Sequence, residues 1–405
     1  MIKRAFYILS IILVSYFIFI SGKKKSETEP LNFTAPESFY FNINDILSEQ
    51  KAGKFDSIFK RLNKKGVFNG TVIYGERGCE VFKGAYGYAD FRKKDTLLVQ
   101  SAFQLASVSK MFTAMAIMKL QQDGNLNYDD TITKFISDFP YTEVTIRQLL
   151  NHRSGLSRYM SLADKYWNIN KPINNEDVVK LFVKYKPAPY FKPDNGFHYC
   201  NTNYVLLASV VERITGVTFD KFVLENIFKP LGMDNSFVYN LNNDSVLPRI
   251  IPVGVPGYKY GGRYARKMGN YYLNGVMGDK GIYSTVEDMF KFDQALNNGI
   301  LVSLSTLSEA FTRGSPKYWR RKDNYGFGWR IKEDADSTAY HFGWWKGFRS
   351  FYIRDMKNDR VIIALTNTHN GFSSEVLWDI VEDDLNKEEL LSVYNKLKPN
   401  PMNIQ

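Results

Sequence analysis

Ser107 and Lys110 are the residue pair in this sequence that is best suited to covalent chemistry. They lie three positions apart, and residues at that spacing are neighbours on one face of a helix. The lysine would therefore lie within reach of the serine hydroxyl. Because burial favours the neutral amine form of a lysine, Lys110 could accept the serine proton and activate the oxygen as a nucleophile. The pair predicts acyl transfer through a covalent serine ester.

The same serine-lysine spacing occurs at four places in the chain, so the surroundings decide between them. Ser21 lies in an apolar segment near the start, and Ser48 and Ser57 lie in a charged stretch before the first expected strand. Ser107 instead comes just before Met111–Leu120, which is apolar almost all round and predicts a buried helix. The N-terminus of that helix also offers backbone N–H groups to a developing oxyanion.

A second constellation is Tyr199-Cys200-Asn201, which precedes an expected helix over Tyr204–Ile214. On an extended segment, side chains two positions apart point to the same side. The phenol would supply a proton-transfer group and the carboxamide a hydrogen-bonding group. The same pattern also occurs elsewhere in the chain, for example at Tyr40-Phe41-Asn42 and Tyr166-Trp167-Asn168, where it is typical of a loop tyrosine and a turn asparagine.

Seven segments occur together in the order and spacing of the serine beta-lactamase-like hydrolases. The chain is most similar to the branch with class C beta-lactamases and penicillin-binding-protein-like enzymes, which includes esterases and D-amino-acid peptidases. The resemblance covers about residues 45–385. The segments are SVSK at 107–110, LLNHRSGL at 149–156, YCN at 199–201, PLGMDNS at 230–236, GDKGIYST at 278–285, YGFGW at 325–329 and HFG at 341–343.

The resemblance implies a role for each residue of the first two motifs. By motif position, Ser107 would be the acylated nucleophile and Lys110 its base. Tyr199 would shuttle protons in both acylation and deacylation. Asn201 would bind Lys110 and the amide of the substrate.

The third motif departs from the family pattern, because His341-Phe342-Gly343 stands where the family has lysine, threonine or serine, and glycine. By motif position, His341 and Gly343 would bind substrate. The backbone N–H of Trp344 would form the oxyanion hole together with that of Ser107. A histidine is mostly neutral near pH 7 and is expected to become a cation only below about pH 6.5. The departure favours ester or peptide substrates over efficient beta-lactam hydrolysis.

Strand and helix patterns predict an α+β fold with one antiparallel sheet built from both chain ends, flanked by helices, and with an inserted helical subdomain. The active cleft is expected where the two parts meet. Strands are predicted at Gly70–Tyr74, Cys79–Tyr86, Phe348–Ile353 and Val361–Thr366, and helices at Thr145–His152, Asn174–Tyr185, Tyr204–Ile214 and Ser374–Leu385.

The N-terminus predicts export. A basic start is followed by sixteen uncharged residues from Ala5 to Ile20. With the next two residues the segment approaches the roughly 20 residues that span a bilayer, so residues 1–22 are either a cleaved signal or an N-terminal membrane anchor. Residues 23–41 are expected to be a polar tether, residues 42–385 the hydrolase domain and residues 386–405 a tail. The expected location is extracytoplasmic or periplasmic.

The amino-acid composition narrows the classes of cofactor and binding partner that the protein could have. The four histidines and two cysteines show no metal-binding spacing, so neither a metal site nor a cofactor is expected. Outside the N-terminus, the net charge of +11 comes from scattered lysines and arginines, which does not imply nucleic acid binding. The expected partner is a small-molecule or peptide substrate, with contact to a cell wall or a membrane surface.

The predicted function is that of an exported serine hydrolase acting on an ester or amide, including D-amino-acid peptides. Two alternatives stay open: a catalytically silent binding or sensor module on the same fold, and a true beta-lactamase. Retention of Ser107, Lys110, Tyr199 and Asn201 favours activity.

Overall fold

The computed structural model describes residues 37–240, 254–261, 264–315, 324–332, 337–369 and 371–382. The chain divides into a short N-terminal unit that ends at Leu47 and a main unit that begins at Ser48. The predicted export segment, the tether up to residue 36 and the predicted tail lie outside the described residues. Across the described residues, every helix is too short or too polar to cross a bilayer.

The first described helix, α2 (Glu37–Lys64), begins within the predicted tether. Residues 37–41, which the sequence assigned to the polar tether, form the start of this helix. Pro36 is the last proline before a long stretch without one, so nothing from residue 37 onward removes a helical hydrogen bond.

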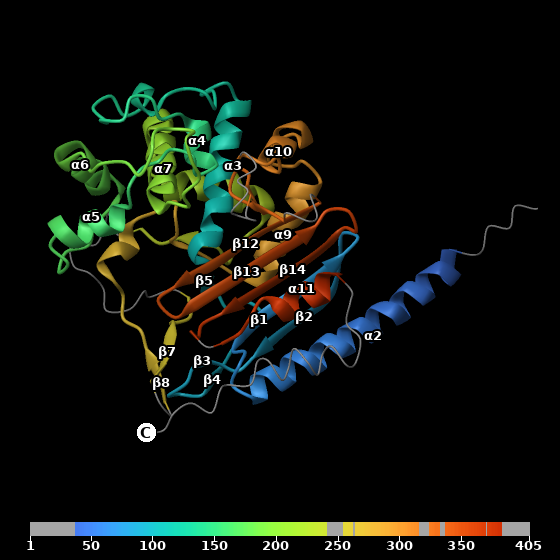
Figure 1. Ribbon diagram of the computed structural model, residues 1–405. Coiled ribbons are helices and arrows are strands. Elements are labelled where there is room, and N and C mark those ends of the chain that lie inside the picture. Colours follow the sequence, from blue (N-terminus) through green and yellow to red (C-terminus); the bar gives the residue numbers. More distant parts are fainter. Residues whose placement is uncertain are drawn as a thin grey trace, which may run out of the picture. The chain divides into compact units, whose positions relative to one another are not determined.

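Seven strands form one antiparallel sheet in the order β10-β11-β12-β13-β14-β1-β2. The two ends of the main unit meet within this sheet, because β1 pairs with β14 along its whole length, from Gly70 opposite Thr366 to Glu76 opposite Arg360 (Figure 1). The predicted sheet from both chain ends is therefore confirmed. The strands are β1 (Gly70–Glu76), β2 (Cys79–Tyr86), β10 (Asn324–Tyr325), β11 (Arg330–Ile331), β12 (Thr338–Trp345), β13 (Phe348–Asp355) and β14 (Arg360–Thr366).

Both faces of the sheet are covered, which explains why its central strands are apolar on both sides. Val72 of β1 packs with Phe59 of α2 and Leu377 of α11 (Glu375–Glu382) in one core cluster. Its neighbour Ile73 points to the opposite face and belongs to the larger cluster, which includes Met115 of α3. Burying each such side chain contributes about 1.5–3 kcal/mol to folding. The sheet is thus a rigid support between two apolar layers.

The middle of the chain is mainly helical, as predicted, and lies on the α3 side of the sheet (Figure 1). It adds to one large core that also contains α3 and α9. The helices are α3 (Ser109–Gln122), α4 (Ile146–Leu150), α5 (Tyr159–Tyr166), α6 (Asn175–Tyr185), α7 (Asn201–Thr215), α8 (Phe219–Val223), α9 (Val286–Asn297) and α10 (Leu304–Ala310).

Short elements connect the sheet to the helical region. A three-stranded sheet with the order β5-β9-β6 leads directly into the 3-10 turn η1 (Ala106–Val108), which is followed by α3. The hairpin β7–β8 lies beside the end of β14, where Tyr258 bridges to Thr368. These elements are β3 (Tyr88–Asp90), β4 (Asp95–Thr96), β5 (Phe103–Gln104), β6 (Phe237–Val238), β7 (Tyr258–Gly261), β8 (Tyr264–Lys267), β9 (Ile282–Ser284), η2 (Ile132–Lys134), η3 (Leu224–Phe228), η4 (Lys229–Leu231) and η5 (Tyr272–Gly275).

Candidate active site

Ser107 lies in η1, between β5 and the buried helix α3. The preceding residue, Ala106, is 1% exposed and has a φ of 48°, a left-handed conformation that a residue with a Cβ adopts at some cost. Surrounding contacts must therefore hold this turn in place. This turn places the Ser107 side chain at the N-terminal end of α3, as the sequence predicted.

Lys110, one turn further along, is completely buried, and its ammonium nitrogen faces the serine. Lys110 Nζ lies 3.2 Å from Ser107 Oγ and donates a second hydrogen bond, of 2.8 Å, to the backbone carbonyl of Asp279. The predicted i, i+3 contact between serine and lysine is present in the structure. The Asp279 carbonyl was not predicted from the sequence.

Tyr199 precedes α7 and lies against the same lysine. Lys110 Nζ is 5.0 Å from the centre of the Tyr199 ring. On its other side the ring packs against His152 at a centroid distance of 4.4 Å, and the Arg330 guanidinium lies over it at 5.2 Å. The Tyr199 hydroxyl is buried and has no hydrogen-bond partner among the described residues, so it is available to a substrate.

Asn201 is the first residue of α7, and its amide oxygen is likewise buried without a partner among the described residues. The hydrogen bond between Asn201 and Lys110 that the family resemblance implied is therefore not formed. Lys110 makes its second bond to the carbonyl of Asp279 instead. The unpartnered oxygens of Tyr199 and Asn201 are two buried polar groups on one turn whose hydrogen-bonding capacity is unused.

His152, in the LLNHRSGL segment, is fully buried, and its ring centre lies 4.4 Å from that of Tyr199. Its Nδ1 accepts from the backbone N–H of Cys200 at 3.3 Å and lies 3.1 Å from the Asn203 amide nitrogen. Burial, together with the charges of Lys110 and Arg330, lowers the pKa of His152 well below its usual value. The neutral imidazole thus holds the turn that carries Tyr199 through a hydrogen bond and a ring contact.

Gly343 lies where β12 passes closest to η1. A Cβ atom at this position would lie 2.3 Å from the backbone oxygen of Leu105 and 3.0 Å from the backbone nitrogen of Ser107. Only a glycine permits this approach. It brings the backbone next to Trp344 toward the backbone N–H of Ser107, while the Trp344 side chain is 59% exposed and its indole N–H donates to His369 Nδ1 at 2.6 Å.

His341 is buried on β12, and its ring lies 6.1 Å from that of Tyr199. His341 Nδ1 lies 3.0 Å from the carbonyl of Phe342, which can only accept, so Nδ1 carries the proton. Nε2 then accepts from the hydroxyl of Tyr325 at 2.9 Å. Both ring nitrogens are therefore occupied in the neutral form.

The expectation that His341 becomes a cation below about pH 6.5 was wrong. Burial lowers its pKa well below the usual value, and the positive charges of Arg330 and Lys110 lower it further. The sequence could not reveal this, because the tyrosine partner and the two cations come from other elements. His341 is therefore not expected to supply a cation to a substrate carboxylate.

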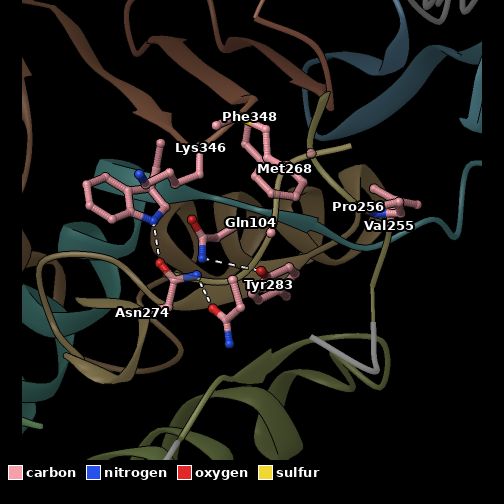
Figure 2. Close-up of a pocket in the computed structure, with 12 residues that line it drawn as sticks. Gln104, Val255, Pro256, Met268, Asn274, Tyr283, Lys346 and Phe348 are labelled. Carbon is pink, nitrogen blue, oxygen red and sulfur yellow. Dashed lines mark hydrogen bonds between the residues drawn. The ribbon is translucent and has the colours of Figure 1, made fainter. Parts of the chain in front are cut away.

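A pocket lies at the turn between β12 and β13 (Figure 2). It encloses about 350 Å³ of space that is open to solvent, and its wall includes Gln104 of β5 and Trp345 of β12. Gln104 donates to the Tyr283 hydroxyl at 3.3 Å, and the Trp345 indole donates to Asn274 at 2.6 Å. The residues that line this pocket do not include Ser107, Lys110 or Tyr199.

Two charged residues at the site went unrecognised in the sequence. No role was predicted for Asp279 and Lys280 from the sequence, yet both side chains are buried, at 1% and 3% exposed. The available signal was their position between two glycines, Gly278 and Gly281, in one of the family-like segments. A turn so confined by glycines can approach another backbone closely.

A family model establishes the class of the protein. The Beta-lactamase family model matches residues 55–386, so the chain belongs to this family of beta-lactamase-like serine hydrolases. Among curated proteins, penicillin-binding protein 4* of Bacillus subtilis is 34% identical over 338 residues, which is 79% of this chain and 73% of that protein. The family predicted from the sequence motifs is thus confirmed.

Solved structures agree with this assignment. A penicillin-binding protein from Bacillus halodurans is 25% identical with a TM-score of 0.68, over 80% of this chain and 96% of that one. A D-amino acid amidase from Ochrobactrum anthropi is 24% identical with a TM-score of 0.68, over 86% of this chain and 99% of the amidase. The similarity to the amidase shows that the two proteins share a fold.

Proposed function

We propose that this protein is an exported hydrolase that cleaves an ester or amide, D-amino-acid peptides included, through an acyl-enzyme on Ser107. The observation that carries the proposal is the 3.2 Å contact between Lys110 Nζ and Ser107 Oγ in a buried setting. The basic and apolar pattern of residues 1–22 supports export, and a substrate of cell-wall type would suit that location.

Acylation would proceed by proton transfer and attack. Neutral Lys110 takes the proton of Ser107, whose oxygen bonds to the carbonyl carbon of the substrate. The backbone N–H groups of Ser107 and Trp344 stabilise the resulting oxyanion. As the bond to the leaving group breaks, Tyr199 returns a proton to it, and Lys110 can replenish the phenol.

Deacylation would reverse these roles with water as the nucleophile. Tyr199 first passes its phenol proton to neutral Lys110 and then, as the phenolate, takes a proton from the water, whose oxygen attacks the ester carbon. The bond to Ser107 breaks as the Ser107 oxygen regains a proton from the Lys110 ammonium, which restores the starting state. The unpartnered amide oxygen of Asn201 suits an N–H donor of an amide substrate. The neutral state of His341 favours substrates that need no cation at that position.

Active-site labelling tests the nucleophile. A fluorophosphonate should add one covalent mass to the wild type at Ser107, and Ser107→Ala and Lys110→Ala should lose it. A matched control exists in α2, where Ser57 and Lys60 have the same spacing but Lys60 pairs with Asp56 at 2.6 Å. Ser57→Ala and Lys60→Ala should label like the wild type. Absence of label in the folded wild type would indicate a catalytically silent module.

A comparison of substrates tests the proposed bond type. The purified protein is given a short-chain ester, a D-Ala-D-Ala peptide and a chromogenic beta-lactam, and kcat/KM is measured for each. The ester or the peptide should be turned over faster than the beta-lactam. A beta-lactam that is hydrolysed faster than both would make the protein a true beta-lactamase and refute the proposed substrate class.

A further inference from the structure

The loop over residues 276–281 is held against the helix that carries the proposed base. Thr113 of α3 donates to the carbonyl of Gly278 at 2.7 Å. One turn earlier on the same helix, Lys110 donates to the carbonyl of Asp279 at 2.8 Å. Two successive carbonyls of the loop therefore face two successive turns of α3, and the second of them orients the lysine.

The opposite side of the loop is fixed equally well. The backbone N–H of Met277 donates to the Asn175 amide oxygen at 2.7 Å, and the Asn175 amide nitrogen donates back to the Met277 carbonyl at 3.0 Å. Gly278 and Gly281 both have left-handed φ values, of 98° and 101°. These conformations direct the Asp279 carbonyl toward α3 and its side chain away from it.

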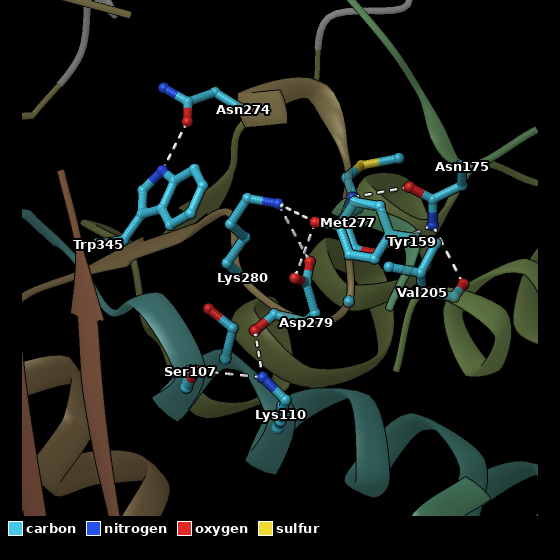
Figure 3. Close-up of polar contacts among 12 residues, drawn as sticks. Ser107, Lys110, Tyr159, Asn175, Val205, Asn274, Met277, Asp279, Lys280 and Trp345 are labelled. Carbon is cyan, nitrogen blue, oxygen red and sulfur yellow. Dashed lines mark hydrogen bonds and ion pairs between the residues drawn. The ribbon is translucent and has the colours of Figure 1, made fainter. Parts of the chain in front are cut away.

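That side chain belongs to a closed polar cluster. Lys280 Nζ donates to the Tyr159 hydroxyl at 2.7 Å, and this hydroxyl donates to Asp279 Oδ2 at 3.0 Å (Figure 3). Lys280 Nζ also lies 3.3 Å from Asp279 Oδ1 and 5.1 Å from the centre of the Trp345 ring. Burying an ion pair is costly, so its presence beside a proposed base calls for a reason.

We propose that Asp279 and Lys280 are a positioning pair for Lys110, whose opposite charges hold the Asp279 carbonyl in place and balance the electric field at the lysine. The inference rests on the proposed role of Lys110 as the base. Removing either charge would leave the other buried close to Lys110 without compensation. The pH at which activity falls on acidification would then change.

The other charged and titratable side chains around Lys110 should not mask an effect of Asp279 and Lys280 on the pH dependence of activity. Burial keeps His152 and His341 neutral, with pKa values well below the usual range. Burial raises the pKa of Tyr204 well above its usual value, and Arg330 keeps its charge throughout. Tyr199 contacts Lys110 through its ring face. Burial and the charge of Lys110 both lower the pKa of Lys280, so the two ammonium groups sense each other.

The test is the pH dependence of kcat/KM for a neutral ester. Lys280→Met leaves the Asp279 carboxylate unbalanced and should move the acid limb to higher pH by about one unit, the order expected for one charge at an effective dielectric near 20. Asp279→Asn should move the limb to lower pH. The double variant Asp279→Asn/Lys280→Met restores neutrality and should return the limb close to its wild-type position.

The control is Tyr159→Phe, which removes the bridging hydroxyl and keeps both charges. It should lower kcat/KM by less than about tenfold and leave the acid limb in place. Thermal unfolding shows which variants fold. If the single charge variants do not fold, the pH profile of the double variant decides whether the pairing role holds. A wild-type acid limb in Lys280→Met, or a displaced limb in the double variant or in Tyr159→Phe, would overturn the pairing role. Failure of the wild type to label at Ser107 would instead overturn the proposed function.

Discussion

Replacing Gly343 by alanine tests how strictly the two backbone segments of the proposed oxyanion hole are spaced. The new Cβ would lie 2.3 Å from the Leu105 carbonyl oxygen, whereas ordinary contact begins at 3.4 Å. The gap between β12 and η1 must therefore open by 3.4 − 2.3 = 1.1 Å. The Leu105 oxygen belongs to the backbone and cannot rotate away.

Such a displacement should be severe for catalysis and mild for folding. A misplacement of about 1 Å can reduce a rate about 100-fold. Loss of one oxyanion donor costs about 100- to 1,000-fold in kcat. Gly343→Ala should therefore lose about two orders of magnitude in kcat on an ester, with KM nearly unchanged because the affected contact forms in the transition state. The assay combines steady-state kinetics, the rate of fluorophosphonate labelling and the melting temperature.

Two controls separate the backbone clash from other causes. The Cβ would also lie 2.2 Å from Ser350 Oγ, so Gly343→Ala/Ser350→Ala removes the side-chain clash and keeps the backbone one. This double variant should remain impaired. Gly53→Ala, at an exposed helical position with no atom within 4 Å of the new Cβ, should behave as the wild type. A kcat within threefold of the wild type in Gly343→Ala, or full rescue by Ser350→Ala, would refute the reasoning.

Three further outcomes are expected. Tyr199→Phe should slow acylation and deacylation alike, by about 100-fold or more, as presteady-state kinetics would show, and a variant that merely stalls at the acyl-enzyme would contradict the shared role. The kcat/KM ratio of a carboxylate substrate to its amide should stay flat between about pH 5.5 and 8, since His341 remains neutral; a rise on acidification would speak against its buried hydrogen bonds. Burial raises the pKa of Asp293 to about 6, above its unfolded value of about 3.9, so this carboxyl stabilises the fold most below about pH 4 and the contribution is lost as the pH rises through 6. In urea unfolding, the advantage of the wild type over Asp293→Asn should shrink from pH 4 to pH 7, and an advantage that grows would exclude the raised pKa.

The parts of the fold that could be predicted are those with strong local patterns. The hairpin of β1 and β2 and the pair β13 and β14 are β-rich runs bounded by turns, and α3 is apolar on every side. Strands β10 and β11 have two residues each, too few for any period to be visible. Their place in the sheet is set by pairing with β12, which is a tertiary effect.

At the site, the local pair was predictable and the distant partners were not. Ser107 and Lys110 lie three positions apart just before an apolar helix, so their spacing together with that context predicts their contact. The Tyr325 hydroxyl that occupies His341, and the carbonyl that takes the place of Asn201 at Lys110, come from segments far away in the chain. Sequence patterns describe single elements, whereas hydrogen-bond partners depend on how elements are packed.

The pairing of β1 with β14 also determines when the protein can become active during synthesis. Ser107 and its lysine leave the ribosome early, but β12, which approaches η1 at Gly343, is made much later. Contacts between segments so distant in the chain form slowly, because a long loop must close first. On the proposed mechanism, a growing chain would therefore carry Ser107 without the second oxyanion donor, and hydrolytic competence would arise only when the last strands join the first.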